Sequence, residues 1–252
     1  MRNLYVLFLI FLSICSGALA QDSRISTKAP HTNLSQTYPT SFIDRPLVLN
    51  KNDWQMSFDN QLIRIENLSF AFTNLGVSYS AFENFELGAS MIAAGYAHFE
   101  GVSAPIFLQL PNLKAKYQIW NSDLKVSVGG SYYFTPTGSD LQLLTLESKY
   151  ILDPVAFSAV IHSGFFGGEQ GWIARPGIQW QVHPQLAASL GYEMIFLDVS
   201  LKDTSFAGFR WMPALSWNVS ENVDLEGYGY IYSIDSEDLA LMHFGINVNW
   251  RL

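Results

Sequence analysis

Beyond residue 50, apolar and polar residues alternate along most of the chain, and this two-residue period is the strongest constraint on the fold. In the final stretch, MHFGINVNWRL, every second side chain from Phe244 to Leu252 is apolar and those between are small or polar. Successive side chains of a strand point to opposite faces, so this stretch is a strand with one apolar and one polar face. No convincing helical period occurs in the same part of the chain. The sequence therefore predicts an all-β fold.

Five similar segments divide the alternating pattern into hairpins. Each has an aromatic residue at a strand end, a tight polar turn with Asn, Asp, His or Pro, and then renewed alternation, which is a hairpin signal. The five turns imply ten strands, and segments at 53–62 and at the C-terminus bring the number to twelve. Longer polar or glycine-rich stretches between the hairpins (AHFEGVSAPIF, TPTGSD, GFFGGEQG and DSEDL) predict loops at the opposite end. The hairpin segments are 78–87, 116–126, 149–157, 179–188 and 216–225.

Composition indicates what the apolar faces meet. Hydrophobic residues make up 49% of the chain and charged residues only 14%, whereas a typical soluble domain is about 25% charged. No run after Ala20 approaches the roughly 18 apolar residues of a membrane helix. Together these observations favour a closed antiparallel up-and-down transmembrane β-barrel of about 12 strands. A secreted β-sandwich or soluble barrel is the alternative, but its polar face would have to serve as the whole surface, and charge is sparse.

The first twenty residues have the layout of a secretory signal peptide. Arg2 precedes an apolar stretch, and Ala18-Leu19-Ala20 form a small-residue cleavage site. We therefore expect a signal peptide (1–20), a flexible periplasmic lead-in (21–50) and an outer-membrane barrel (51–252). An even number of strands places both termini with the short turns, on the periplasmic side. Aromatic residues near the turns would form a girdle there: Tyr79, Tyr117, Tyr150, Trp180, Trp217 and Trp250.

The stretch DRPLVLNKNDW (44–54) resembles a motif that precedes the first strand of many Gram-negative outer-membrane barrels, roughly DRPLxLPxGxW. Asn50 stands where proline is usual, and Asn52 where glycine is usual. The resemblance implies a porin-like or transporter-like barrel in the cell outer membrane, in contact with lipid and lipopolysaccharide. The last strand is similar to the signal read by the barrel-assembly machinery, which the resemblance implies as a partner.

The polar faces of such a barrel line its lumen. Strand alternation assigns six acidic and seven basic residues to this face. These charges either pair across a narrow bore or form separate walls across a water-filled pore. In the second hypothesis, the basic wall holds Lys114, Lys116, Arg175 and Arg210, and the acidic wall Glu86, Glu193, Asp224 and Glu226. The predicted lumen-lining residues are Glu86, Lys114, Lys116, Lys125, Glu147, Lys149, Arg175, Glu193, Arg210, Asp224, Glu226 and Arg251.

A narrow channel for passive diffusion or uptake of small polar solutes is the function that we expect. A structural, non-conducting barrel with a salt-bridged lumen is the alternative, and an outer-membrane lipid-modifying enzyme is a second one. The enzyme hypothesis rests on His162 and Ser163, but adjacent strand residues point to opposite faces, so we expect no catalytic site. His98 and His243 lack partners at metal-ligand spacing, so no metal or cofactor is expected. The net charge of −8 argues against nucleic acid as a partner.

Overall fold

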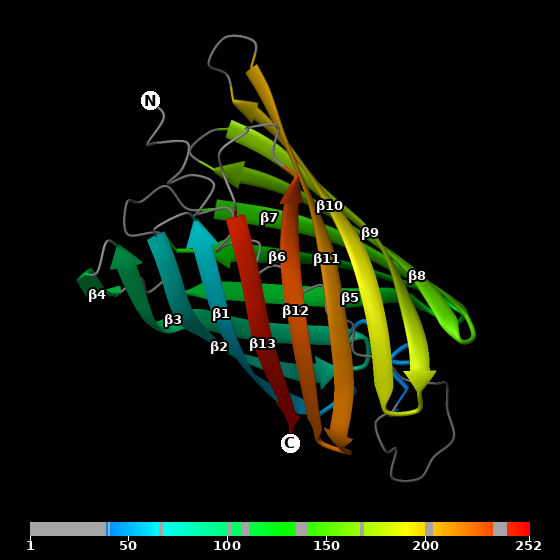
Figure 1. Cartoon of the computed structure of the whole chain (residues 1–252). Helices are drawn as coiled ribbons and strands as arrows, with labels where there is room; N and C mark the ends of the chain where they lie inside the picture. The colour runs from blue at the N-terminus through cyan, green and yellow to red at the C-terminus, as the bar shows by residue number, and fades with distance from the viewer. Residues whose placement is uncertain are drawn as a thin grey trace.

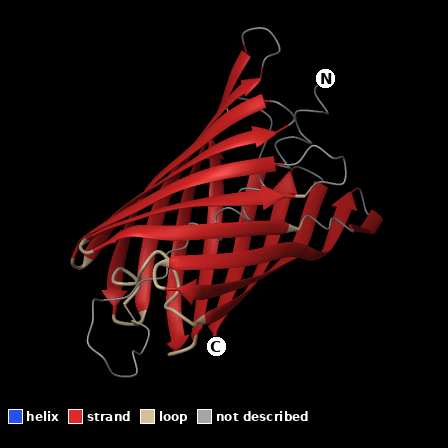
Figure 2. Cartoon of the chain, turned by 180° about the vertical axis from the view of Figure 1, so that it is seen from behind, coloured by secondary structure: helices blue, strands red, loops and turns tan. Residues whose placement is uncertain are grey.

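The computed structural model describes residues 39, 41–65, 68–99, 102–106, 111–134, 141–166, 169–199, 204–233 and 241–252. Within these ranges the chain forms thirteen β-strands (Figure 2). No described helix is long and apolar enough to cross a membrane. The strands are β1 (Trp54–Ile65), β2 (Leu68–Phe82), β3 (Phe85–Phe99), β4 (Val102–Ile106), β5 (Asn112–Asn121), β6 (Leu124–Tyr133), β7 (Leu141–Leu152), β8 (Val155–Phe166), β9 (Glu169–His183), β10 (Leu186–Val199), β11 (Thr204–Ser220), β12 (Val223–Ser233) and β13 (Leu241–Arg251).

The strands form one closed antiparallel sheet (Figure 1). Strands that follow one another in the chain pair with each other, except for β4 and β5, and β1 pairs with β13 so that Met56 lies opposite Trp250. The short β4 pairs with the far half of β3, whereas β5 pairs with the half of β3 next to the β2–β3 turn. These two strands therefore share one position in the ring, and the barrel has twelve strand positions. The prediction of a closed barrel of about twelve strands is confirmed.

The outer surface of the barrel is apolar and its interior is polar, the reverse of a water-soluble domain. On β7, Leu144 and Leu146 are 64% and 46% exposed, while Glu147 and Lys149 are each 0% exposed. This alternation matches the two-residue period of the sequence. Since the described strands form one closed sheet rather than two stacked sheets, the β-sandwich alternative is wrong.

The tight turns and the C-terminus lie at one end of the barrel, which we call the turn end (Figure 1). The final residue still belongs to the ladder, since the Leu252 N–H donates to the Trp54 carbonyl at 2.9 Å. Near this end, Trp54 and Tyr79 stack with ring centroids 4.4 Å apart. Five of the six aromatic residues expected in a girdle are 45–54% exposed: Tyr117, Tyr150, Trp180, Trp217 and Trp250. The five tight turns fall where the sequence predicts them: 83–84, 122–123, 153–154, 184–185 and 221–222.

Two stretches expected as loops are largely strand. AHFEGVSAPIF contains the end of β3 and all of β4, and GFFGGEQG contains the end of β8 and the start of β9. Pairing with the neighbouring strand holds these glycine-rich and polar residues extended, although their local pattern is weak. The other two expected loops, 135–140 and 235–239, lie outside the described residues, as do the expected signal peptide (1–20) and residues 21–38.

Candidate functional site

The interior at the turn end is occupied by residues 41–50, which we call the inner segment. Ile43, Leu47, Val48 and Leu49 are each at most 2% exposed, and burying one such side chain contributes about 1.5–3 kcal/mol. The chain then reverses into β1 through a turn in which Asn52 has a φ of 68°, a left-handed conformation that Asn tolerates better than most residues. The Asn52 N–H donates to the Ser80 carbonyl at 2.7 Å, which fixes this reversal against β2.

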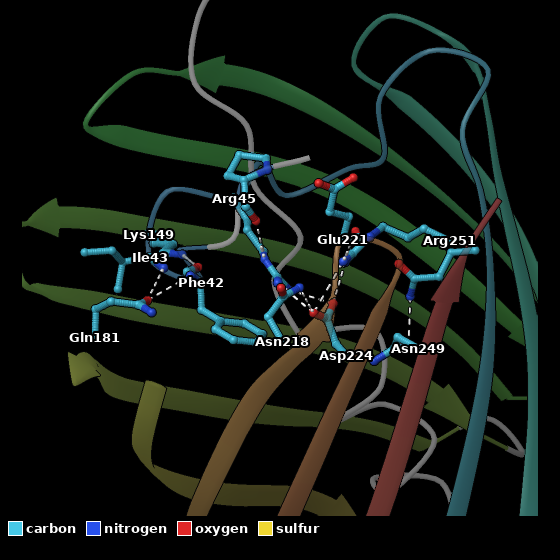
Figure 3. A network of polar contacts seen from close by, with 12 residues as sticks. Phe42, Ile43, Arg45, Lys149, Gln181, Asn218, Glu221, Asp224, Asn249 and Arg251 are labelled. Atoms are coloured by element: carbon cyan, nitrogen blue, oxygen red, sulfur yellow. Dashed lines mark hydrogen bonds and ion pairs between the residues drawn. The ribbon is translucent and has the colours of Figure 1, made fainter. Parts of the chain in front are cut away.

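Wall side chains from β6, β7 and β9 bind the backbone at the start of the inner segment, and Figure 3 shows two of them, Lys149 and Gln181. The Gln181 Oε1 accepts hydrogen bonds from the N–H groups of Phe42 and Ile43, at 2.8 and 3.3 Å. The Lys149 ammonium donates to the Phe42 carbonyl at 2.8 Å, and that of Lys125 to the Asp44 carbonyl at 3.2 Å. These contacts fix the path of the segment across one side of the barrel.

Arg45 forms an ion pair between the inner segment and the wall. Both of its terminal nitrogens donate to the Asp224 carboxylate, each at 2.7 Å, and the Arg45 guanidinium lies 3.7 Å from the centre of the Phe42 ring. Asp224 also accepts bonds from Asn218 at 2.8 Å and from Arg251 (Figure 3). Such bidentate, charge-assisted pairs are the strongest hydrogen bonds in proteins.

The end of the inner segment is bound by β5 and β3. The Leu47 N–H donates to Gln118 Oε1 on β5 at 2.9 Å, and the Leu49 N–H to Glu86 Oε2 on β3 at 3.0 Å. The binding side chains thus come from β3, β5, β6, β7, β9 and β12, and all lie within four residues of a tight turn. The inner segment therefore crosses the bore at the turn end.

This placement differs from the expected lead-in. The sequence predicts a flexible periplasmic segment up to residue 50, but residues 41–50 are packed inside the barrel. Two local signals mark the difference: the apolar run Leu47-Val48-Leu49 follows a long polar stretch, and Arg45 precedes it. Neither signal identifies the binding partners, because Gln118 and Gln181 stand out in no sequence pattern.

Deeper in the barrel, a carboxylate lies between two arginines on neighbouring strands. Glu193 on β10 is directly opposite Arg210 on β11 and pairs with its Nε at 2.5 Å. The other Glu193 oxygen accepts from Arg175 Nε on β9. The Arg210 guanidinium lies 4.2 Å from the centre of the Tyr230 ring. All three charged groups are at most 4% exposed, so this triad depends on its internal partners rather than on water.

A second ion pair lies on the opposite wall. Lys116 Nζ on β5 is 2.6 Å from Glu147 Oε2 on β7, and the Ser127 hydroxyl donates to the same oxygen at 3.4 Å. Acids and bases are therefore interspersed around the wall. The hypothesis of separate basic and acidic walls is wrong, because Arg175 and Arg210 share the carboxylate of Glu193.

All twelve predicted lumen residues have side chains on the inner face of the strands. Lining of an open pore stays a prediction. Half-buried are Glu86, Lys114, Lys116 and Glu226. Buried are Lys125, Glu147, Lys149, Arg175, Glu193, Arg210, Asp224 and Arg251.

A chain of hydrogen bonds joins β12, β1 and β13 inside the barrel. The Tyr228 hydroxyl donates to Asp59 at 2.7 Å, and Gln61 donates to the same carboxylate at 2.5 Å. The amide oxygen of Gln61, Oε1, lies 2.9 Å from His243 Nε2. Gly245 faces the Tyr228 ring, and a Cβ added there would overlap with that ring.

We therefore expect Gly245→Ala to destabilise the barrel by about 1–3 kcal/mol, since Tyr228 must shift away from Asp59. A urea titration in detergent, followed by the mobility of unboiled protein on a gel, measures the change. Gly227→Ala is the matched control, because a Cβ there meets nothing within 4 Å. Equal urea midpoints for the two variants would contradict the packing described here.

His162 contacts Thr145 rather than Ser163, the residue that the enzyme hypothesis would require it to activate. Its Nδ1 lies 2.8 Å from the Thr145 hydroxyl, and the ring is fully buried on the inner face of β8. Ser163, the adjacent residue, points to the other face of the strand. Among the described residues, no group of three or more His, Cys, Asp and Glu side chains is arranged to hold a metal ion.

Two small cavities lie along the inner wall. One of about 110 Å³ is bordered by both polar and apolar residues of β8 to β12, and one of about 30 Å³ lies beside the Lys116 ion pair. Small residues such as Ser158, Gly177 and Ser189 leave room in the larger cavity. The larger cavity has room for water molecules beside polar groups such as the Arg175 guanidinium.

The closed barrel resembles solved porin structures. The KdgM porin shares 14% sequence identity with this chain, and the two structures align with a TM-score of 0.55 over 77% of this chain and 98% of the porin. The structure of KdgM in complex with disordered oligogalacturonate shares 15% identity and has the same TM-score of 0.55. The NanC porin shares 10% identity and a TM-score of 0.58 over 77% of this chain and all of the porin. The fold is a porin-type barrel. No protein-family model and no curated protein sequence matches the chain.

Proposed function

We propose that this porin-type barrel is a narrow channel for small polar solutes in the outer membrane of a Gram-negative bacterium, with the turn end in the periplasm. The apolar outer face supports a membrane location, since a closed barrel satisfies every backbone group within lipid. Short turns on the periplasmic side are the rule for outer-membrane barrels, which supports the orientation.

The charged inner wall is the observation that carries the channel proposal. Charges inside a barrel must be paired or hydrated, and members of the ion pairs here, Arg175 and Lys116, border internal cavities. A small polar solute would exchange its hydration for contacts with such a wall. Because Glu193 lies between Arg175 and Arg210, the field across the bore is weak, and we expect only modest ion selectivity.

A non-conducting structural barrel is the second candidate. The inner segment supports it, because buried apolar side chains and an ion pair hold residues 41–50 across the bore. The proposals differ in whether ions pass through a correctly folded barrel.

Conductance in planar lipid bilayers tests the channel. We expect discrete steps smaller than those of 16-stranded porins, because a twelve-position barrel encloses less space. The full chain is compared with the variant Arg45→Ala/Leu47→Asp, called the released variant, which loses the Asp224 pair and places a carboxylate at a buried position. Boiled protein is the control for contaminating channels. Absence of steps from both folded proteins would favour the structural barrel.

A further inference from the structure

We propose that the turn-end wall is a binding site for an extended, arginine-containing peptide and that the inner segment is its tethered, exchangeable ligand, which closes the channel until it is displaced. This inference rests on the proposed channel function. The site consists of Glu86, Gln118, Lys125, Lys149, Gln181 and Asp224.

The contacts have the character of peptide recognition. Five of these wall side chains bind backbone N–H or carbonyl groups of the inner segment, which any extended peptide offers. Asp224 binds a side chain of the segment, that of Arg45, with two hydrogen bonds. The site therefore selects an extended backbone in general and an arginine at one place.

The barrel retains its own contacts when the inner segment leaves. Closure depends on the ladder between β1 and β13, in which residues 41–50 take no part. Asp224 keeps Arg251 and Asn218 as partners, so loss of Arg45 leaves no isolated buried carboxylate. Lys125 and Lys149 donate to carbonyl groups of the segment, which water or a solute can replace.

The closed state is favoured by the tether. The inner segment continues directly into β1 through the turn at residues 50–53, where the Asp53 N–H bonds the Asn50 carbonyl at 3.0 Å. A ligand joined by so short a linker is present at a very high effective concentration. A free peptide therefore competes well only after the tethered segment is weakened.

Bilayer recordings of the full chain test this inference. We expect Arg45→Ala to raise the open fraction about tenfold or more, because a charge-assisted pair is lost, and the released variant to stay open. Lys51→Ala is the matched control, since Lys51 is exposed just beyond the inner segment, and it should behave as the wild type. The mobility of unboiled protein on a gel checks that each variant is folded.

A synthetic peptide with the sequence SFIDRPLVLN (41–50), added at the turn end, should block the released variant, and the same peptide with alanine in place of arginine should block about tenfold more weakly. Equal conductance of wild-type and released proteins, with no block by peptide, would overturn the inference. If no variant conducts, the channel proposal and the closing role both fail, and binding of fluorescent peptide to the released variant then decides whether the site itself exists.

Discussion

Replacing Glu193 with glutamine should destabilise the barrel by about 3–5 kcal/mol, because one partner of a buried ionic group is removed and the others remain. Arg175 and Arg210 both donate to this carboxylate and are almost completely buried. Glutamine has nearly the same shape, so the loss comes from the missing charge and from one fewer acceptor oxygen. The urea midpoint of the detergent-solubilised barrel measures the effect.

Two further variants make this prediction specific to the triad. Glu83→Gln removes the same charge from an exposed turn residue and should leave the midpoint nearly unchanged. Adding Arg175→Met and Arg210→Met to Glu193→Gln should recover much of the stability, because no unpaired charge is then buried. If Glu193→Gln and Glu83→Gln unfold at the same urea concentration, the negative charge of Glu193 is stabilised by water rather than by the two arginines.

Replacing Ile246 with arginine should strongly reduce the amount of barrel inserted in the membrane. Ile246 lies midway along β13 and is 55% exposed on the outer face. An arginine on the lipid face near the midplane costs about 2–4 kcal/mol, and β13 must also pair with β1 to close the barrel. Fractionation of the cell envelope, with boiled and unboiled samples compared on a gel, measures the folded fraction.

A control variant separates the effect of where the arginine lies from the effect of introducing an arginine at all. Asp123→Arg places the same side chain in an exposed turn, where it should have little effect. Folded Ile246→Arg protein at wild-type levels would show that this face of β13 does not meet lipid.

The strands and turns of this protein follow from short-range information. A two-residue period assigned Phe244 to the apolar face and Lys149 to the polar face, and turn residues such as Asn84 and Pro184 marked where the chain reverses. Alternation and turn-forming residues act over a few positions, so they can be recognised without knowledge of the rest of the chain. They also place the twelve charged residues on the inner face.

The partners of those charged residues do not follow from the period. Arg210 and Glu193 become neighbours only through the register between β10 and β11, and Lys116 reaches Glu147 two strands away. Periodicity fixes the face of a side chain, but not its height relative to residues on other strands. The expectation of separate charged walls failed for this reason.

By itself, the sequence determined a closed barrel with an apolar exterior and a charged interior, because the pattern of each strand and the need to satisfy every backbone group leave few other solutions. Only the tertiary structure decided what fills the turn end. Residues 41–50 have no strand period, and their position depends on six side chains brought together from six strands by closure. A binding site assembled across a whole barrel exists only once the ring is complete, so no local stretch of sequence contains it.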